Sequence, residues 1–306
     1  MPSGINPLPP ANPRPGKAAK TTQVTDPAQQ FLENEWVAEN AYRRVPPRTI
    51  YLAVDSNLRL ILAVFPEGLE MAYPSSGNVV ADRIYDNIMA YTAAQPPPAA
   101  DDVRHKLSGP WSKLNPHLKV CGVYHWGSWT ELGKSQGTIL TRDTLLSPAY
   151  CHRARSDLLR SMGELTRAVD FVFKVLDHSL RHEYRDVFQG LNPSVKISTT
   201  EEEVFTLRAV IINLLTEDHV DNGDWRAGLS FLAPLGDFTG ADLCLPALKI
   251  RVPLPSGSIG SIRGREFRHF ITSWIGKGRV SVVHTTHETA RREVFGRIGK
   301  DGVGSG

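Results

Sequence analysis

Apolar and polar positions are arranged differently in the two halves of the chain. In the first half, residues 48–55 and 58–65 form two apolar runs separated by Ser56 and Asn57. Apolar runs of strand length joined by a two-residue polar turn are typical of a β-hairpin. Residues 118–125 form one more run of this kind, so the first half is expected to contribute strands as well as helices.

Two segments of the first half follow the helical period. Residues 78–94 form a helical pattern that ends before the three prolines at 96–98. Between residues 156 and 188, apolar residues recur every three or four positions, which predicts one long amphipathic helix. A helix of this kind packs on a sheet, so we expect it to be scaffold and not site. Its stripe consists of Leu159, Met162, Leu165, Val169, Val172, Leu176 and Leu180.

After Gly190 the chain becomes a series of short apolar runs separated by turn residues. Several short strands with regular turns indicate a sandwich or a barrel. We therefore predict an α+β protein with a double-stranded β-helix (jelly-roll) core and the N-terminal helices packed outside the sheet. The runs cover residues 204–215, 229–234, 243–248, 250–254, 258–262, 270–274 and 279–284.

The length of 306 residues allows one large domain or two small ones. We predict a single domain over residues 31–300, with its core at about 204–287. Residues 1–30 are rich in proline and poor in apolar residues, which predicts a disordered tail. Residues 301–306 are expected to be a flexible C-terminus.

Composition and charge indicate the cellular compartment of the protein and the charge of its substrate. The three cysteines are widely spaced and form no CxxC pair, which indicates a reducing compartment. No apolar run reaches 18 residues and the N-terminus lacks the apolar core of a signal peptide, so we expect an intracellular, soluble protein. The net charge is only +3, but residues 249–300 hold eleven Lys or Arg against three acids. This local excess favours a negatively charged substrate, although solvated strand edges give the same pattern.

His219 and Asp221 form the only His-x-Asp or His-x-Glu motif in the chain. In an extended backbone, residues i and i+2 project to the same face, so both side chains can bind one metal ion. Two imidazoles and one carboxylate on one face of an iron ion leave three positions open, as in non-haem Fe(II) oxygenases. The motif by itself is weak, because an isolated pair of this kind also arises by chance.

A second histidine ligand has to come from a later strand, and His269, His284 and His287 lie far enough along the chain. His269 is followed by Arg279 on the next expected strand. His284 lies five residues after Arg279, and this odd spacing puts the two side chains on opposite faces of a strand. We favour His269 as the third ligand and keep His284 as the second choice. Otherwise His269 is an ordinary surface or core histidine.

Arg279 and Ser281 share one strand face through their spacing of two. A guanidinium binds a carboxylate through two parallel hydrogen bonds, and a serine hydroxyl can add a third. The pair is thus a candidate anchor for a dicarboxylate, unless Arg279 is simply an exposed arginine of an edge strand. Asn213, on the strand before His219, is a further candidate for contact with this cosubstrate, or an ordinary strand residue.

The spacing of these candidates resembles that of the 2-oxoglutarate/Fe(II)-dependent dioxygenase superfamily: His219-x-Asp221, His269 and Arg279-x-Ser281. Residues 234–246, 255–257 and 263–264 look most like fungal TET/JBP-like dioxygenases, which oxidise methylated bases in nucleic acid. The similarity covers about residues 205–287. Ala241 departs from a glycine that is usual in such segments, and Ser256-Gly257 replaces the more common Gly-Asp.

The resemblance implies an enzyme that uses Fe(II), 2-oxoglutarate as cosubstrate and O2. Fe(II) would be held by His219, Asp221 and His269, and 2-oxoglutarate by Arg279 and Ser281. The implied substrate is a methyl group on a modified base such as 5-methylcytosine, in methylated nucleic acid and more specifically DNA. A nuclear location follows from this, and we expect a monomer.

A base in a duplex must leave the stack to reach a buried iron, so such an enzyme needs backbone contacts and a stacking surface. Arg263, Arg265, Arg268, Arg291 and Arg292 are candidates for the backbone contacts. Asp224 and Trp225 could contact a base; equally, Asp224 caps a turn and Trp225 packs on the rim. A hydroxylase of a small molecule or protein side chain, and a binding module without activity, remain as alternatives.

Overall fold

The computed structural model describes residues 27–100, 105, 111, 113, 115–130, 137–145 and 152–301. The tail predicted for residues 1–30 lies outside this description up to residue 26, whereas residues 27–30 begin helix α1 (Pro27–Ala41). The predicted flexible C-terminus lies outside it from residue 302 onward. Within the described ranges, every helix is too short or too polar to cross a lipid bilayer.

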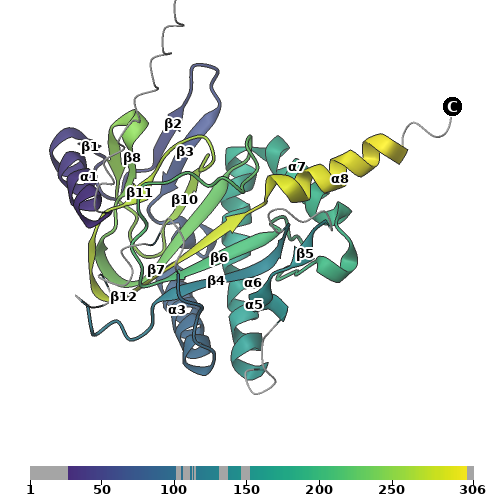
Figure 1. Cartoon of the computed structure of the whole chain (residues 1–306), viewed down its shortest axis with the longest axis horizontal. Coiled ribbons are helices and arrows are strands. Elements are labelled where there is room, and N and C mark those ends of the chain that lie inside the picture. The colour runs from purple at the N-terminus through teal and green to yellow at the C-terminus, as the bar shows by residue number, and fades with distance from the viewer. Residues whose placement is uncertain are drawn as a thin grey trace, which may run out of the picture.

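An eight-stranded antiparallel sheet lies at the centre of the molecule, in the order β2-β3-β10-β7-β12-β6-β4-β5 (Figure 1). The predicted hairpin is confirmed, because β2 and β3 pair with Tyr51 opposite Val64. The strands are β2 (Tyr51–Val54), β3 (Leu60–Phe65), β4 (Gly122–Trp129), β5 (Ile139–Leu140), β6 (Leu207–Ile212), β7 (Ser230–Gly240), β10 (Ile259–Ile262) and β12 (Trp274–Thr285).

A four-stranded sheet with the order β1-β9-β8-β11 faces the large one. An apolar cluster that includes Leu62, Leu232, Leu243 and Ile250 fills the space between the two sheets. Two sheets that share one core are the arrangement predicted for a jelly roll. The strands of the small sheet are β1 (Arg43–Arg44), β8 (Leu243–Leu245), β9 (Ile250–Val252) and β11 (Phe270–Ile271).

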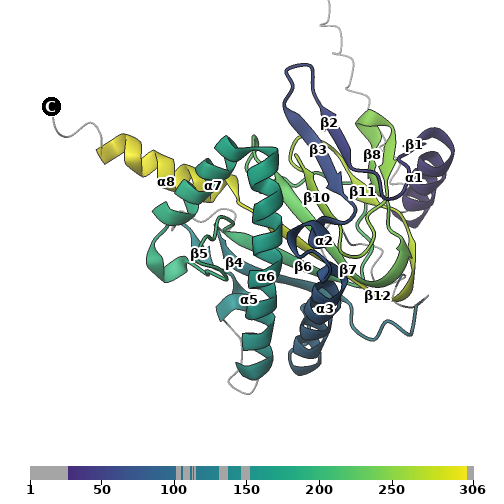
Figure 2. The same ribbon diagram turned by 180° about the vertical axis from the view of Figure 1, so that it is seen from behind.

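Helices α3 (Gly77–Ala94) and α6 (His152–Leu176) cover the other face of the large sheet, as predicted (Figure 2). Val280 and Val282 of β12 join the core beneath these helices. The alternate residues Arg279 and Ser281 therefore face the opposite way, into the space between the sheets. One strand thus contributes scaffold residues on one face and candidate site residues on the other.

The single helix predicted between residues 156 and 188 is wrong, because the chain breaks at Asp177. Asp177 has φ −156° and ψ 88°, and its carboxylate accepts a hydrogen bond of 2.9 Å from the backbone N–H of Leu180. A side chain that caps the next turn competes with continuation of the preceding helix. Helix α6 therefore ends at Leu176, and α7 (His178–Gly190) begins a new direction.

The strand predicted over residues 118–125 also has different bounds, since β4 starts at Gly122 and continues to Trp129. The additional four residues carry the strand to the edge of a cavity described below. The remaining short elements and the C-terminal helix are α2 (Gly68–Ala72), α5 (Arg142–Leu145), η2 (Pro193–Val195), η3 (Pro246–Leu248) and α8 (Glu288–Asp301).

Candidate metal centre and binding cavity

Backbone pairing brings His219 and His269 together. His219 lies in the connection between β6 and β7, and His269 immediately precedes β11. The backbone N–H of His219 donates to His269 O at 3.1 Å, and the N–H of His269 donates to His219 O at 3.0 Å. This isolated antiparallel bridge fixes the separation of the two residues through their main chains.

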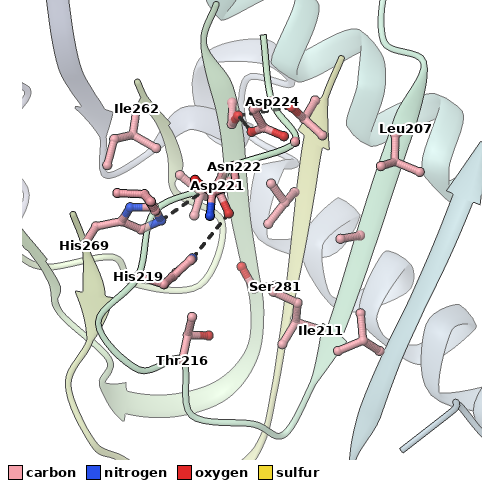
Figure 3. A pocket seen from close by; sticks show the side chains of 18 of the residues that line it. Leu207, Ile211, Thr216, His219, Asp221, Asn222, Asp224, Ile262, His269 and Ser281 are labelled. Atoms are coloured by element: carbon pink, nitrogen blue, oxygen red, sulfur yellow. Dashed lines mark hydrogen bonds and ion pairs between the residues drawn. The ribbon is translucent and has the colours of Figure 1, made fainter. Parts of the chain in front are cut away.

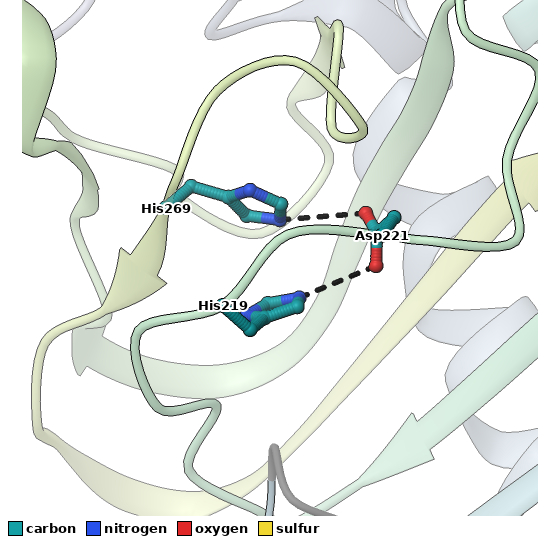
Figure 4. A group of neighbouring side chains, drawn as sticks. All are labelled: His219, Asp221 and His269. Carbon is teal, nitrogen blue, oxygen red and sulfur yellow. Dashed lines mark ion pairs between the residues drawn. The ribbon is translucent and has the colours of Figure 1, made fainter. Parts of the chain in front are cut away.

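The side chains of His219, Asp221 and His269 converge on one point (Figure 4). His219 Nε2 lies 3.3 Å from Asp221 Oδ1, and His269 Nε2 lies 3.5 Å from Asp221 Oδ2. One ligand atom from each residue lies within 4.8 Å of the others. The distance between position 269 and the 219/221 pair is thus small enough for shared coordination of one ion.

Each imidazole is oriented by a backbone carbonyl. His219 Nδ1 lies 2.7 Å from Glu217 O, and His269 Nδ1 lies 3.0 Å from Phe267 O. A ring that donates from Nδ1 keeps its Nε2 lone pair for a metal. Burial, with a smaller contribution from His219, lowers the pKa of His269 to about 4, so this ring is neutral at physiological pH. Neutral imidazole is the form that binds a metal ion.

Gly264 positions the carboxylate of Asp221. The backbone N–H of Asp221 donates to Gly264 O at 2.9 Å. A Cβ atom at position 264 would lie 2.4 Å from Asp221 Oδ2, closer than nonbonded atoms approach. The two histidines and the carboxylate, with these supports, form a donor set that fits a divalent iron ion with open positions.

The three side chains line a cavity of about 520 Å³ between the two sheets (Figure 3). Arg279 and Ser281 of β12 line the same cavity. Apolar side chains form much of the remaining wall, among them Ile211 and Leu232 of the large sheet and Ile271 of the small one. The cavity therefore combines a candidate metal-binding wall, the buried cation of Arg279 and an apolar surface, as ligand sites commonly do.

Arg279 is a buried cation without an anion. Only 3% of the residue is exposed, and no acidic group of the described residues forms an ion pair with it. Its guanidinium lies over the ring of Phe238, 5.3 Å from the centroid, and Nε has no hydrogen-bond partner among the described residues. Burial lowers the pKa of Arg279 to about 10. The alternative of an exposed edge arginine is therefore wrong, and the side chain is suited to bind an anion in the cavity.

Asn213 binds the backbone of Arg279 and is not among the residues that line the cavity. Its Oδ1 accepts a hydrogen bond of 2.8 Å from the N–H of Arg279, and its Nδ2 donates to Val120 O at 2.8 Å. The residue has φ 53°, the left-handed conformation that asparagine tolerates better than most residues. Contact of Asn213 with a cosubstrate stays a prediction; in the structure both ends of its amide bind backbone groups.

His284, the second choice for the third ligand, points away from the cavity. It is fully buried on the helix-covered face of β12, where its Nε2 lies 3.2 Å from Thr166 Oγ1. Five residues separate it from Arg279, and the strand places the two on opposite faces. His284 is therefore a core residue.

His287, the remaining rival, lines the outer part of the cavity with Asp224. Asp224 accepts a hydrogen bond from Ser230 Oγ, and its Oδ1 lies 3.8 Å from His287 Nε2. The ring of His287 lies at 24° to that of Trp129, with centroids 6.5 Å apart. Asp224, His287 and Trp129 together offer polar atoms and aromatic faces to a ligand in the cavity.

Trp225 and Arg263 are not among the residues that line the cavity, and their contact with a substrate stays a prediction. The Trp225 ring is buried and stacks on Tyr184 at a centroid distance of 4.8 Å. Arg263 is buried and donates to Leu60 O at 2.6 Å and to Ala227 O. Both side chains thus connect neighbouring segments of the chain next to the cavity.

Arg265 is half-buried and donates to Asp224 O at 2.8 Å, so it positions the rim. Two exposed arginines have acidic partners: Arg268 pairs with Asp218 at 2.9 Å, and Arg292 pairs with Glu288 at 2.9 Å. Arg291 lies over the Trp225 ring, 4.9 Å from its centroid. Part of the local excess of basic residues is thus compensated by acidic neighbours.

Sequence reasoning did not find Trp129, His125 and Gly264 as parts of the site. Trp129 and His125 lie on β4, where their rings are 5.1 Å apart and both line the cavity. Their role depends on the pairing of β4 with β6, which no local pattern reveals. Gly264 had one signal, its place directly after Arg263 in the segment that carries the family resemblance.

Comparison with known proteins supports the fold. No family model matches the chain, and no curated protein matches it. Among solved structures, NgTET1 in complex with 5mC DNA is 14% identical and superposes with a TM-score of 0.54 over 90% of this chain and 98% of that chain. This similarity confirms the predicted fold class, a jelly roll with helices outside.

Two further solved structures align less closely. An oxidoreductase of the 2OG-Fe(II) oxygenase family from Burkholderia pseudomallei is 12% identical, with a TM-score of 0.40 over 74% of this chain and 88% of that chain. A prolyl-4-hydroxylase from Pseudomonas putida is 14% identical, with a TM-score of 0.37 over 74% of this chain and 92% of that chain.

Proposed function

We propose that this protein is an Fe(II)- and 2-oxoglutarate-dependent dioxygenase that oxidises a methyl group on a modified base in DNA, such as 5-methylcytosine. The observation that carries the proposal is a single cavity that holds both a His-Asp-His cluster and a buried arginine for which the described ranges provide no acidic partner. Either feature alone is compatible with many proteins. Together they supply a place for a metal ion and for the anionic end of a molecule that can also bind that metal.

His219, Asp221 and His269 would hold the iron. When bound, the iron supplies the activation of O2 and the oxidation of a C–H bond, coupled to conversion of 2-oxoglutarate to succinate. The protein contributes fixed orientation: two backbone carbonyls set the ring tautomers, and Gly264 leaves room for the carboxylate.

Arg279 and Ser281 would bind the carboxylate of 2-oxoglutarate that lies farther from the metal. A dicarboxylate neutralises the guanidinium and satisfies its free Nε, which has no partner among the described residues. Asn213 would keep Arg279 in position through the backbone. Burial strengthens this pairing, because a charge pair in a dry site is screened less than one at the surface.

The rim would hold the base. Asp224 and His287 offer hydrogen-bonding atoms, and the near-parallel rings of His287 and Trp129 offer stacking faces. Base–aromatic stacking contributes about 1–3 kcal/mol per base in other proteins. NgTET1, which has the same fold, was solved with 5mC DNA, and this supports the choice of a methylated base. A DNA substrate also leads us to propose a nuclear location.

The proposal is tested with the purified protein, Fe(II), 2-oxoglutarate and three substrate pools: DNA oligonucleotides with methylated bases, small metabolites and peptides. We expect succinate release and an added oxygen atom on the modified base, detected by mass spectrometry. His219→Ala and Asp221→Ala should abolish turnover and keep the fold. Turnover only with peptides or metabolites would instead show a hydroxylase of those molecules. Bound iron without turnover of any pool would indicate a binding module.

A further inference from the structure

Helix α7 carries two histidines whose rings meet on the outside of the molecule. His178 and His182 are four residues apart, so they lie on one face of the helix. Both side chains are exposed, and no residue of α7 lines the cavity between the sheets. The ring centroids are 4.5 Å apart, the ring planes are at 84°, and the two Nε2 atoms are 3.0 Å apart.

The separation of these nitrogens matches shared coordination of one metal ion. With metal–nitrogen bonds of about 2.0–2.1 Å, two nitrogens 3.0 Å apart subtend roughly 94° at the metal. Adjacent positions of a square-planar or octahedral complex are separated by about 90°, whereas a tetrahedral site needs about 109°. The pair is therefore closer to the geometry of Cu²⁺ or Ni²⁺ than to that of Zn²⁺ in a tetrahedral site.

We propose that His178 and His182 form a second metal site, which binds a divalent transition metal of the Cu²⁺ or Ni²⁺ type through the two Nε2 atoms. Water molecules fill the remaining positions, since both rings are exposed. Imidazole is a common ligand of both metals. Without a metal, a hydrogen bond between the two Nε2 atoms accounts for their approach, and metal binding replaces this bond.

The helix turn that carries the pair is held rigidly, so the two rings are close together before any metal binds. Asp177 caps the first turn through Leu180. Arg181, between the two histidines, makes a buried two-pronged ion pair with Asp170 at 2.7 and 2.9 Å. Tyr184, one turn further, is fixed by hydrogen bonds with both the N–H and the carbonyl of Leu229. Preorganised ligands lose less conformational entropy when the metal binds.

The site can be tested separately from the iron site, because the two share no residue. The protein, free of any histidine tag and of bound metal, is titrated with Cu²⁺ and Ni²⁺ by calorimetry, and the Cu²⁺ complex is examined by electron paramagnetic resonance. We expect two binding sites in the unaltered protein. His182→Gln should weaken the α7 site at least tenfold and keep the other site. His269→Gln should have the reverse effect.

His117→Gln is the matched control, since His117 is also exposed but contacts no other histidine of the described residues; its Nε2 lies 3.0 Å from Gly276 O. This variant should bind metal like the unaltered protein. Unchanged number and affinity of sites in His182→Gln would overturn the proposal, whatever the outcome at the iron site. Tighter binding of Zn²⁺ than of Ni²⁺ at the α7 site would contradict the proposed square-planar or octahedral coordination.

Discussion

Arg279→Met should make the metal-free protein more stable and its binding of 2-oxoglutarate much weaker. The side chain is buried in the cavity without an acidic partner in the described part of the chain, and burial lowers the pKa of Arg279 to about 10. Each pKa unit corresponds to about 1.4 kcal/mol, so the unpaired charge destabilises the fold by roughly 3 kcal/mol. Methionine has a similar length and no charge, and it adapts to irregular apolar space.

The loss of affinity for 2-oxoglutarate is expected to be of similar size to this gain in stability. Removal of one partner from a buried charge pair costs about 2–5 kcal/mol in other complexes. At about 1.4 kcal/mol per factor of ten, the dissociation constant of 2-oxoglutarate should rise by roughly 30-fold to several thousand-fold. The affinity of Arg279→Lys for 2-oxoglutarate should lie between that of the unaltered protein and that of Arg279→Met, because an ammonium keeps the charge and loses the two-pronged geometry.

Two measurements check this prediction. Urea denaturation of the metal-free protein gives the free energy of unfolding, and anaerobic titration of the Fe(II) protein gives the affinity for 2-oxoglutarate. We expect the unfolding free energy of Arg279→Met to equal or exceed that of the unaltered protein. A variant that unfolds more easily and binds 2-oxoglutarate equally well would refute the reasoning, because Arg279 would then be structural and the anion site would lie elsewhere.

Three further predictions concern the residues around the cluster. Gly264→Ala places a Cβ atom 2.4 Å from Asp221 Oδ2, so iron affinity should fall roughly 10- to 100-fold, measured by competition with a chelator. Asn213→Gly keeps the left-handed backbone and removes the amide that holds Arg279, so the KM for 2-oxoglutarate should rise about tenfold at little change in kcat. The pKa of His269 is lowered in the folded state, so its contribution to stability is present above pH 6.5 and is lost as the pH falls toward 4. The free energy of unfolding of the metal-free protein, measured by denaturation, should therefore fall by about 3 kcal/mol over this range. This fall should be absent in His269→Gln.

Matched controls separate these effects from general damage. Gly296→Ala adds a Cβ atom with no neighbour within 4 Å, so iron affinity should not change. Lys249→Gly replaces another residue with a left-handed backbone, at φ 49° and outside the cavity lining, so the KM for 2-oxoglutarate should not change. An equal effect in a control and its partner variant would remove the assigned role of that partner.

The sequence predicts the parts of the fold and site that depend on local periodicity. The spacing of two between His219 and Asp221, and between Arg279 and Ser281, places each pair on one face whatever the rest of the chain does. The odd spacing between Arg279 and His284 correctly separates their faces. The hairpin of β2 and β3 and the helix α3 follow from equally local signals.

Features that depend on register or on unusual backbone conformation were not predicted. Trp129 reaches the rim because β4 pairs with β6 in one particular register. Asn213 turns behind Arg279 because its φ is positive, and Asp177 ends a helix whose apolar stripe continues unbroken. Ala241 adopts φ 56°, a conformation that favours glycine, in the position where the family resemblance expects glycine.

The reciprocal main-chain hydrogen bonds between His219 and His269 have a consequence for how the protein would acquire the proposed metal. Because these bonds set the spacing of the two backbones without a metal, we expect the metal-free protein to be folded, in contrast to small zinc domains that are unfolded without metal. A homologue that lost one of the three ligand residues would therefore keep the same fold. We expect inactive homologues with this architecture to exist.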